Sequence, residues 1–296
     1  MEKTSIGCKI QPGMQTELVF NAKATLGEGP AWDAKSQSLY WIDILERRIH
    51  AGSELLCELD DLIGCVAPCK NGHLIVAKKA SFVDLDPGSG RQTLLAVLES
   101  EPRGNRLNDG KCDPVGRLIA GSMDMNERES SGKLYTFNGR RITPLLDGIT
   151  ISNGLAWSPD LKIFYYIDTP TREIQAFDYD TASGEIANRR VVVRVAESLG
   201  WPDGMTSDLD GNLWVAMWGG AQITKWNPGT GQLLEQIPVP ALLTSACTFG
   251  GPSMNELYVT SARRGLTQDE LKKYPLSGGL FKIRTKTEGL RTFEFG

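Results

Sequence analysis

The sequence has few of the features that mark several common functional classes. It contains only two histidines, no run of Lys or Arg longer than two residues, and no apolar stretch near the roughly 18 residues that a membrane-spanning helix requires. The scattered basic residues and the net charge of −4 argue against nucleic acid as a partner. Residues 1–14 lack the apolar core of a signal peptide. We therefore expect a soluble, cytoplasmic protein with no membrane or nucleic-acid partner.

Histidine and cysteine chemistry is also sparse. Neither His50 nor His73 has a recognisable partner for a Ser-His-Asp triad, so we expect both to be surface or packed residues. The cysteines form no CxxC pair, and a chain of 296 residues does not need disulfides to hold its fold. We expect buried or incidental thiols at all six positions, which are Cys8, Cys57, Cys65, Cys69, Cys112 and Cys247.

Turn residues, in contrast, are abundant, with 32 Gly and 15 Pro. Sustained helical periodicity is absent, and only Thr267 to Lys273 predicts a helix of one or two turns. Instead, a turn followed by an apolar or alternating strand recurs about every 35 to 50 residues. The six copies begin at Ser38, His73, Arg117, Ile163, Asn212 and Glu256. A second strand follows each copy, at Arg48–His50, Phe82–Leu85, Lys133–Phe137, Glu173–Phe177, Gln222–Trp226 and Gly279–Ile283.

Six repeats of this length predict an all-β protein, a six-bladed β-propeller with one four-stranded antiparallel blade per repeat. No linker-like stretch divides the chain, so we expect a single domain spanning 1–296. An interaction propeller of the WD40 or kelch type is the alternative within this fold. The WD and GH signatures are missing, and Trp41-Ile42-Asp43 is not a WD dipeptide. The missing signatures argue against an interaction propeller, although they do not eliminate it.

Polar residues recur at a fixed distance ahead of the repeated strands. Asn108, Asn153 and Asp203 each lie ten positions before the first apolar residue of a strand, and Glu28 lies eleven positions before its own. Each of these residues lies in a turn-like sequence, and any one of them alone is better explained as a turn residue than as a metal or substrate ligand. Their recurrence at one offset in four repeats instead predicts that they converge at one mouth of the central channel.

Two carboxylates and two amides that converge form an oxygen-rich pocket. Such a set suits Ca²⁺, Mg²⁺ or Mn²⁺, whereas a structural zinc site is disfavoured because no Cys/His constellation occurs. Three or four protein ligands would leave positions for water and substrate, as a Lewis-acid catalyst needs. The pattern therefore indicates a metal-dependent enzyme.

The ordered motifs resemble those of the senescence marker protein, regucalcin and gluconolactonase family. The resemblance runs through nearly the whole chain and is specific through the order of its motifs together with the six-fold repeat. The matching stretches are Gly27-Glu28-Gly29-Pro30, Tyr40-Trp41-Ile42-Asp43, Asn108-Asp109-Gly110-Lys111, Asp113-Pro114, Ser152-Asn153-Gly154-Leu155, Pro202-Asp203-Gly204-Met205 and Gly279-Leu280-Phe281-Lys282-Ile283.

The resemblance implies a six-bladed propeller that hydrolyses sugar-acid lactones with one divalent cation, Ca²⁺, Mg²⁺, Mn²⁺ or Zn²⁺. Glu28, Asn153 and Asp203 would be the metal ligands, and Asp203 would also help to deprotonate the attacking water. The substrate contacts would be Arg106, Asn108, Asp109 and Asn126. The partner would be a small sugar lactone such as gluconolactone, arabinonolactone or xylonolactone. Apart from the resemblance, we expect a monomer, because a closed propeller with no evident apolar patch has no surface that requires a second copy.

One position departs from the family pattern. Some relatives carry a substrate-contacting acid where this chain has Asn126, although Asp124 is near. This leaves open which sugar is bound. Two other functions also remain open: a hydrolase of other esters or organophosphates, and a non-catalytic Ca²⁺-binding regulatory protein.

Overall fold

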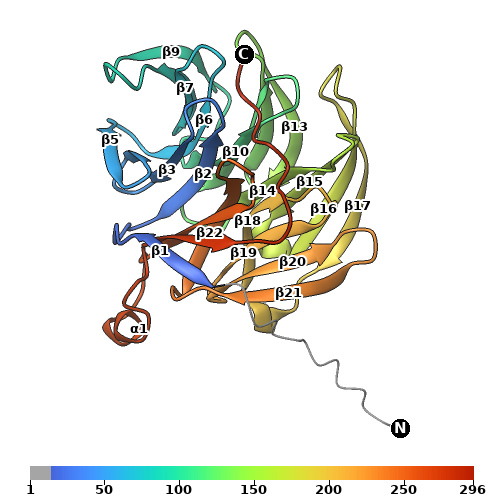
Figure 1. Cartoon of the computed structure of the whole chain (residues 1–296). Helices are drawn as coiled ribbons and strands as arrows, with labels where there is room; N and C mark the ends of the chain where they lie inside the picture. The colour runs from blue at the N-terminus through green and yellow to red at the C-terminus, as the bar shows by residue number, and fades with distance from the viewer. Residues whose placement is uncertain (1–14) are drawn as a thin grey trace.

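The structure is a computed structural model that describes residues 15–296 of the chain. The signal-peptide expectation for residues 1–14 and the thiol of Cys8 lie outside these residues. Most of the described chain forms antiparallel strands, which confirms the all-β prediction (Figure 1). Among residues 15–296, no helix has both the length and the apolar character that crossing a bilayer requires.

Four of the sheets are built from four consecutive strands each. Hairpins join the neighbouring strands. Some of their turns carry Gly or Asn, which favour the positive φ that tight hairpins need, as at Asn138-Gly139. The first two are β2 (Gly27–Asp33), β3 (Ser38–Asp43), β4 (Arg48–Ala51), β5 (Glu54–Glu58), and β6 (Ile63–Pro68), β7 (Leu74–Lys78), β8 (Ser81–Leu85), β9 (Gln92–Val97). The next two are β10 (Asn105–Cys112), β11 (Leu118–Asp124), β12 (Gly132–Phe137), β13 (Ile142–Ile149), and β14 (Ser152–Trp157), β15 (Ile163–Asp168), β16 (Glu173–Tyr179), β17 (Ile186–Arg194).

The remaining strands form one eight-stranded sheet. A single residue pair, Trp218 opposite Leu243, joins its two halves. The first strand of the described chain pairs with the last, since Thr16 lies opposite Ile283. The strands are β1 (Thr16–Phe20), β18 (Trp201–Ser207), β19 (Leu213–Trp218), β20 (Gln222–Asn227), β21 (Gln232–Pro238), β22 (Leu243–Gly250), β23 (Glu256–Ala262) and β24 (Leu280–Arg284).

Within residues 15–296, helical structure is limited to three short segments, η1 (Thr169–Thr171), η2 (Glu197–Leu199) and α1 (Gln268–Lys273). Helix α1 lies in the predicted segment. The Thr267 hydroxyl accepts a hydrogen bond from the Glu270 amide, and the Glu270 carboxylate accepts one from the Thr267 amide. This reciprocal capping box explains why so short a helix begins at a defined residue.

The strands β2, β6, β10, β14, β18 and β22 form a closed ring. Each of them contacts the next in chain order, and β22 contacts β2. They lie toward the middle of the molecule, while β5, β9, β13, β17 and β21 lie farther out (Figure 1). Residues at one end of these ring strands therefore meet around a common axis.

Apolar side chains fill the spaces between neighbouring sheets and between the two halves of the eight-stranded sheet. Phe82 of β8 stacks on Phe137 of β12, with ring centroids 4.8 Å apart. Trp214 of β19 meets Phe249 of β22 edge to face at 5.5 Å. All four rings are almost fully buried, and close-packed interiors of this kind resist displacement. The ring strands consequently have fixed positions relative to one another.

The C-terminal segment crosses one face of the molecule (Figure 1). The Leu290 amide donates to the Ser207 carbonyl at 2.9 Å, and the Phe295 amide donates to the Pro68 carbonyl at 2.8 Å. The segment thus ties β18 to β6 across one end of the strand ring.

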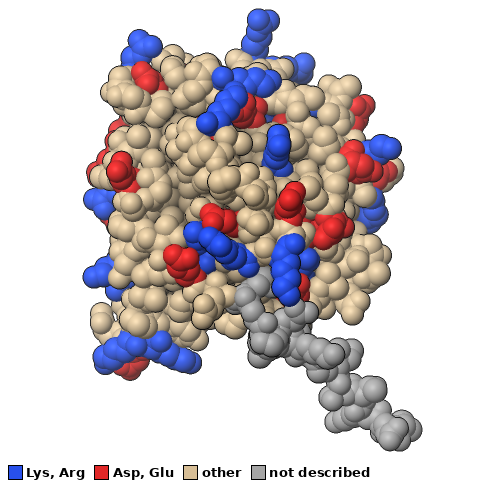
Figure 2. All heavy atoms as spheres, in the orientation of Figure 1, with Lys and Arg blue, Asp and Glu red and all other residues tan. Residues whose placement is uncertain are grey.

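On the side of the molecule in view, basic and acidic side chains are interspersed (Figure 2).

Candidate active site

The four recurring polar residues lie at bulges in the ring strands. The hydrogen-bond register shifts between Glu28 and Ala31 of β2, Leu107 and Asp109 of β10, Asn153 and Leu155 of β14, and Pro202 and Met205 of β18. A bulge bends its strand and re-aims the side chain beside it. Gly154 has φ +36°, and a Cβ there would lie 2.7 Å from the Asp203 carbonyl oxygen. Glycine at this position therefore allows β14 to approach β18 closely.

The bulges place these side chains around one open cavity of about 480 Å³. The buried polar residues of its lining form what we call the floor of the cavity, which comprises Glu28, Arg106, Asn108, Asn153, Thr169 and Asp203. The lining residues are Leu26, Glu28, Arg106, Asn108, Met123, Glu127, Ile151, Asn153, Thr169, Pro170, Trp201, Asp203, Trp218, Arg264 and Gly265. Five of the predicted site residues, Glu28, Arg106, Asn108, Asn153 and Asp203, are among them.

A chain of hydrogen bonds links Arg106 to the neutral residues of the floor. Arg106 Nη1 donates to Asn108 Oδ1 at 2.6 Å, and Asn108 Nδ2 donates to Asn153 Oδ1 at 3.0 Å. Asn153 Nδ2 in turn donates to Thr169 Oγ1 at 2.8 Å, and that hydroxyl donates to the Pro202 carbonyl. The chain ends one residue before Asp203. Because every member is buried, its geometry is held without competition from solvent.

Two carboxylates of the floor are buried and poorly paired. Glu28 is 7% exposed and Asp203 is 5% exposed. Asp203 Oδ1 is a buried oxygen with no hydrogen-bond partner. Burial, and then the carboxylates of Glu28 and Asp109, raise the pKa of Asp203 well above its usual range. Burial, and then the Asp109 carboxylate, raise the pKa of Glu28 to about 8.

These observations fit a bound divalent cation. Buried carboxylates are costly without a countercharge, and the Asp203 oxygen lacks any partner among the described residues. No group of three or more His, Cys, Asp and Glu side chains suited to a metal occurs within residues 15–296. The oxygen donors of the lining that could hold a cation are the two carboxylates and the Asn153 amide oxygen. Hard oxygen donors of this kind suit Ca²⁺, Mg²⁺ or Mn²⁺.

Arg106 is the buried cation of the cavity. Burial, and then the nearby Arg264 guanidinium, lower the pKa of Arg106 to about 10, which leaves it protonated at neutral pH. Its Nη1 donates to the Leu107 carbonyl and to Asn108. In the described part of the chain its Nε and Nη2 groups donate to nothing. A planar guanidinium with free N–H groups facing a cavity suits recognition of substrate oxygens.

Asp109 and Asn126 lie outside this cavity lining. Asp109 follows the bulge in β10 and lines a second cavity instead, although its carboxylate is near enough to raise the pKa of Glu28. Asn126 is exposed, and its backbone and side-chain nitrogens donate to Asp124 Oδ1. The Asp124 carboxylate organises this loop by accepting further amides from Arg128 and Glu129. The neighbouring Glu127 lines the cavity.

Several residues that shape the site were not predicted. Thr169 bridges Asn153 to the strand that carries Asp203. Asp43 accepts backbone amides from the segment that leads into β2, and Asp168 does so for the segment that leads into β14. The sequence did carry a signal for Asp43 and Asp168, because each of them ends a repeated Tyr-aromatic-Ile-Asp strand. Each therefore positions the polar residue of its own sheet.

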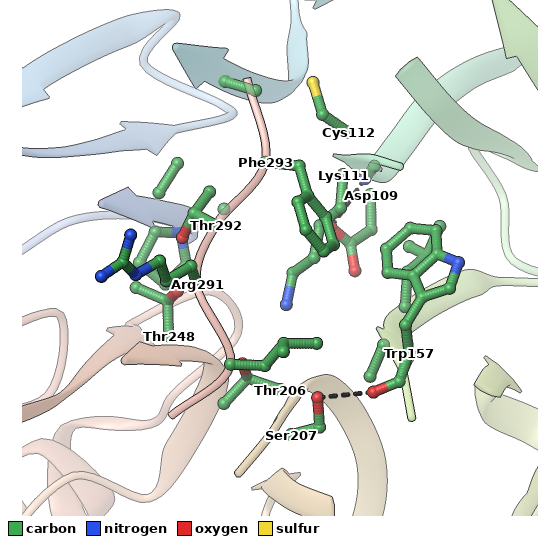
Figure 3. Close-up of a pocket in the computed structure, with 18 of the residues that line it drawn as sticks. Asp109, Lys111, Cys112, Trp157, Thr206, Ser207, Thr248, Arg291, Thr292 and Phe293 are labelled. Atoms are coloured by element: carbon green, nitrogen blue, oxygen red, sulfur yellow. Dashed lines mark hydrogen bonds between the residues drawn. The ribbon is translucent and has the colours of Figure 1, made fainter. Parts of the chain in front are cut away.

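The second cavity lies beneath the C-terminal segment and is much smaller, at about 50 Å³ (Figure 3). Lys111 Nζ donates to the Met205 carbonyl at 2.5 Å, and Ser207 Oγ donates to the Trp157 carbonyl at 2.8 Å. Burial lowers the pKa of Lys111, and the Asp109 carboxylate opposes that shift. Phe293 closes this cavity in (Figure 3). Its size suits a few waters, so the larger cavity is the candidate active site.

The raised pKa of Glu28 predicts an unusual pH dependence for the cation-free protein. A folded pKa of about 8 against an ordinary value of 4.5 means that the folded state binds the extra proton between these values. The contribution of this proton to the free energy of unfolding is therefore fully present below about pH 4.5, and it is lost as the pH rises through about 8. We expect the free energy of unfolding of chelator-treated protein to fall by several kcal/mol across this range, measured by urea denaturation.

Glu28→Gln provides the control because it keeps the size of the side chain and removes its titration. The decline should be smaller in this variant. Cation affinity of the wild type should rise over the same range, since the cation must displace the proton. A wild-type stability that rises steadily from pH 5 to pH 8 without cation would contradict the assignment of a protonated Glu28.

Comparisons with known proteins place these features in context. Residues 26–263 match the family described as SMP-30/Gluconolactonase/LRE-like region. Regucalcin of Danio rerio is 36% identical over 278 residues, covering 91% of this chain and 94% of that protein. A solved regucalcin of Agrobacterium tumefaciens, described as a calcium-binding protein, superimposes with a TM-score of 0.91 at 28% identity, covering 96% and 98% of the two chains. A luciferin-regenerating enzyme superimposes with a TM-score of 0.88 at 32% identity, covering 96% and 99%.

Proposed function

This chain belongs to the SMP-30/gluconolactonase/LRE-like family, and we propose that it is a metal-dependent lactonase that opens a sugar-acid lactone to the free aldonate. The observation that carries the proposal is the pair of buried carboxylates, one with an unpartnered oxygen, beside a buried arginine in an open cavity. An enzyme needs this openness, because substrate must reach the charged groups. The proposal includes a monomer that acts on a small-molecule sugar lactone.

We also propose that the sheets are six blades of one propeller domain. Six ring strands that contact one another in a closed circle support this. The eight-stranded sheet would count as two blades, since only Trp218 and Leu243 pair across its middle. The candidate site would then lie at one mouth of the central channel, where the bulged ends of the ring strands meet.

Glu28, Asn153 and Asp203 would hold the cation. When bound, a divalent cation supplies Lewis-acid polarisation of the lactone carbonyl. Arg106 would donate its free N–H groups to oxygens of the substrate, including charge that develops on the carbonyl oxygen. Both Nδ2 hydrogens of Asn108 are used, by the Ser152 carbonyl and by Asn153. Asn108 would therefore act chiefly by orienting Arg106 and Asn153.

Asp203 would act as the general base. Its unpartnered Oδ1 takes a proton from the attacking water, whose oxygen forms the new bond to the carbonyl carbon. The bond between that carbon and the ring oxygen then breaks, and Asp203 returns the proton to the ring oxygen as it leaves. One water is consumed, and the products are the aldonate carboxyl group and a free hydroxyl.

The experiment that tests the proposal is hydrolysis of a panel of aldonolactones, followed by acid release. Chelator-treated protein is compared with protein given Ca²⁺, Mg²⁺, Mn²⁺ or Zn²⁺. We expect turnover that returns with a cation and identifies the preferred sugar. If no lactone is hydrolysed with any of these cations, the lactonase proposal is wrong.

A non-catalytic cation-binding role is the second candidate, because a relative of closely similar structure is described as a calcium-binding protein. The same carboxylates would then bind Ca²⁺ without chemistry. A site with two carboxylates is expected to bind Ca²⁺ weakly. Submicromolar Ca²⁺ binding by calorimetry, together with absent turnover, would favour this role.

A further inference from the structure

The candidate cavity is larger than a single sugar lactone. A six-carbon aldonolactone occupies roughly 200 Å³, the space of about six or seven waters, whereas the cavity measures about 480 Å³. The charged and amide residues of the floor are buried. Trp201, Pro170, Glu127 and Arg264 line the same cavity but are exposed, which places them at its open mouth.

Trp201 is the most exposed aromatic group of this mouth. It is 41% exposed, and it is the only aromatic residue among the exposed large apolar side chains of residues 15–296. The Arg172 guanidinium lies 3.5 Å from the centre of its ring, and Arg172 Nη1 donates to the Gly200 carbonyl at 2.8 Å. The cation covers one ring face and holds the indole in place. Trp201 also lines the cavity, and a ligand would contact the ring face that Arg172 does not cover.

Glu127 and Arg264 also line this mouth and form an ion pair with each other. They come from segments far apart in the chain, after β11 and after β23, and their side chains are 35% and 40% exposed. Together they offer hydrogen-bond donors and acceptors without net charge. An anionic ligand would compete with Glu127 for Arg264, whereas hydroxyl groups can bond to both partners.

A fixed indole face beside a neutral set of donors and acceptors suits an uncharged sugar ring. The axial C–H groups of a pyranose pack on an aromatic face, and its hydroxyls project sideways toward polar neighbours. Burying the indole further also removes apolar surface from water.

We propose that Trp201, Glu127 and Arg264 form an outer subsite for a second, uncharged sugar ring that is carried as a substituent on the lactone. The preferred substrates would then be lactones of disaccharide aldonic acids. This inference rests on the proposed lactonase function for its substrate class. The lactone ring occupies the floor beside Asp203, and the attached ring stacks on Trp201.

The first test compares kcat/KM for gluconolactone and for the lactone of a β-1,4-linked disaccharide acid in the cation-loaded protein. We expect the wild type to prefer the disaccharide lactone. Trp201→Ala should lower kcat/KM for the disaccharide lactone about tenfold or more, mainly through KM, and should affect the single-ring lactone far less. Trp201→Phe should restore most of the preference. Leu94→Ala removes a side chain that is 61% exposed and outside the cavity lining, and it serves as the surface control.

The second test measures binding of the matching disaccharide alcohol, which has no lactone to open, to cation-free protein by calorimetry. Binding that is lost in Trp201→Ala supports the subsite even if no lactone is hydrolysed, in which case only the lactonase proposal fails. Equal losses for both lactones, or no loss for either, overturn the subsite while leaving the lactonase intact. A larger loss for an aryl-substituted lactone than for the disaccharide lactone also overturns it, since the mouth would then take an aromatic group.

Discussion

Asp203→Ala is expected to lower kcat/KM for the preferred lactone by about 10³-fold or more. The substitution removes a proposed cation ligand and the proposed general base together, and general acid-base groups alone contribute roughly 10² to 10⁴. The measurement is cation-dependent acid release by wild type and variant at matched protein concentration. Activity within tenfold of the wild type would contradict both assigned roles.

We expect the fold to tolerate substitution of Asp203, which Asp203→Asn tests. Burial and the neighbouring carboxylates raise the pKa of Asp203 well above its usual range, so in the cation-free protein its ionised form is disfavoured. Asp203→Asn puts a neutral group of the same shape at this position. We expect the cation-free Tm of this variant to equal or exceed that of the wild type. Its Tm should, however, gain little from added cation, because stabilisation by a ligand follows its affinity. Asp147→Asn, at a residue 74% exposed in a surface ion pair, should keep the full gain.

Asp113→Ala is expected to reduce the free energy of unfolding by about 3 to 5 kcal/mol, the cost of removing one partner from a buried charged network. The Asp113 carboxylate is fully buried. It accepts the amides of Val115 and Arg117, Arg117 Nε and the Tyr179 hydroxyl. Its loss would leave buried donors from two neighbouring sheets without a partner. Urea denaturation followed by tryptophan fluorescence measures the change.

Asp33→Ala is the matched control for Asp113. Asp33 ends the ring strand of its own sheet and makes similar turn contacts, accepting the Lys35 amide and the Ser36 hydroxyl. These contacts are exposed and stay within one turn, so we expect a loss of about 1 kcal/mol or less. Activity per folded molecule should be the same in both variants. Equal destabilisation by the two substitutions would show that the link between sheets carries no extra stability.

The repeat explains why much of the site could be predicted from the sequence. Strand alternation and turn residues are local properties, so the strands at Ser38–Asp43, Ile163–Asp168 and their equivalents follow from neighbouring residues. Glu28, Asn153 and Asp203 occupy corresponding places in different copies, and corresponding places meet in a closed ring. A fixed offset along the chain therefore carried information about distance in space.

Neighbouring residues within one motif were harder to separate. Asn108 and Asp109 are adjacent and both polar, yet they line different cavities. The bulge between Leu107 and Asp109 makes the direction of each side chain depend on how β10 pairs with β11. Period-two alternation fails at a bulge, so the sequence could not tell which of the two faces the carboxylates of the floor.

The sequence by itself determined the all-β class, the repeated strands and the polar residues at their ends, because each depends on local residue pattern. Only the tertiary structure decided that Thr169 supports Asn153, that Glu127 pairs with Arg264, and that an exposed indole stands at the mouth. These contacts join segments distant in the chain, and loop positions depend on how whole sheets pack. The raised pKa values of the floor carboxylates likewise depend on burial, which exists only once the ring of strands has closed.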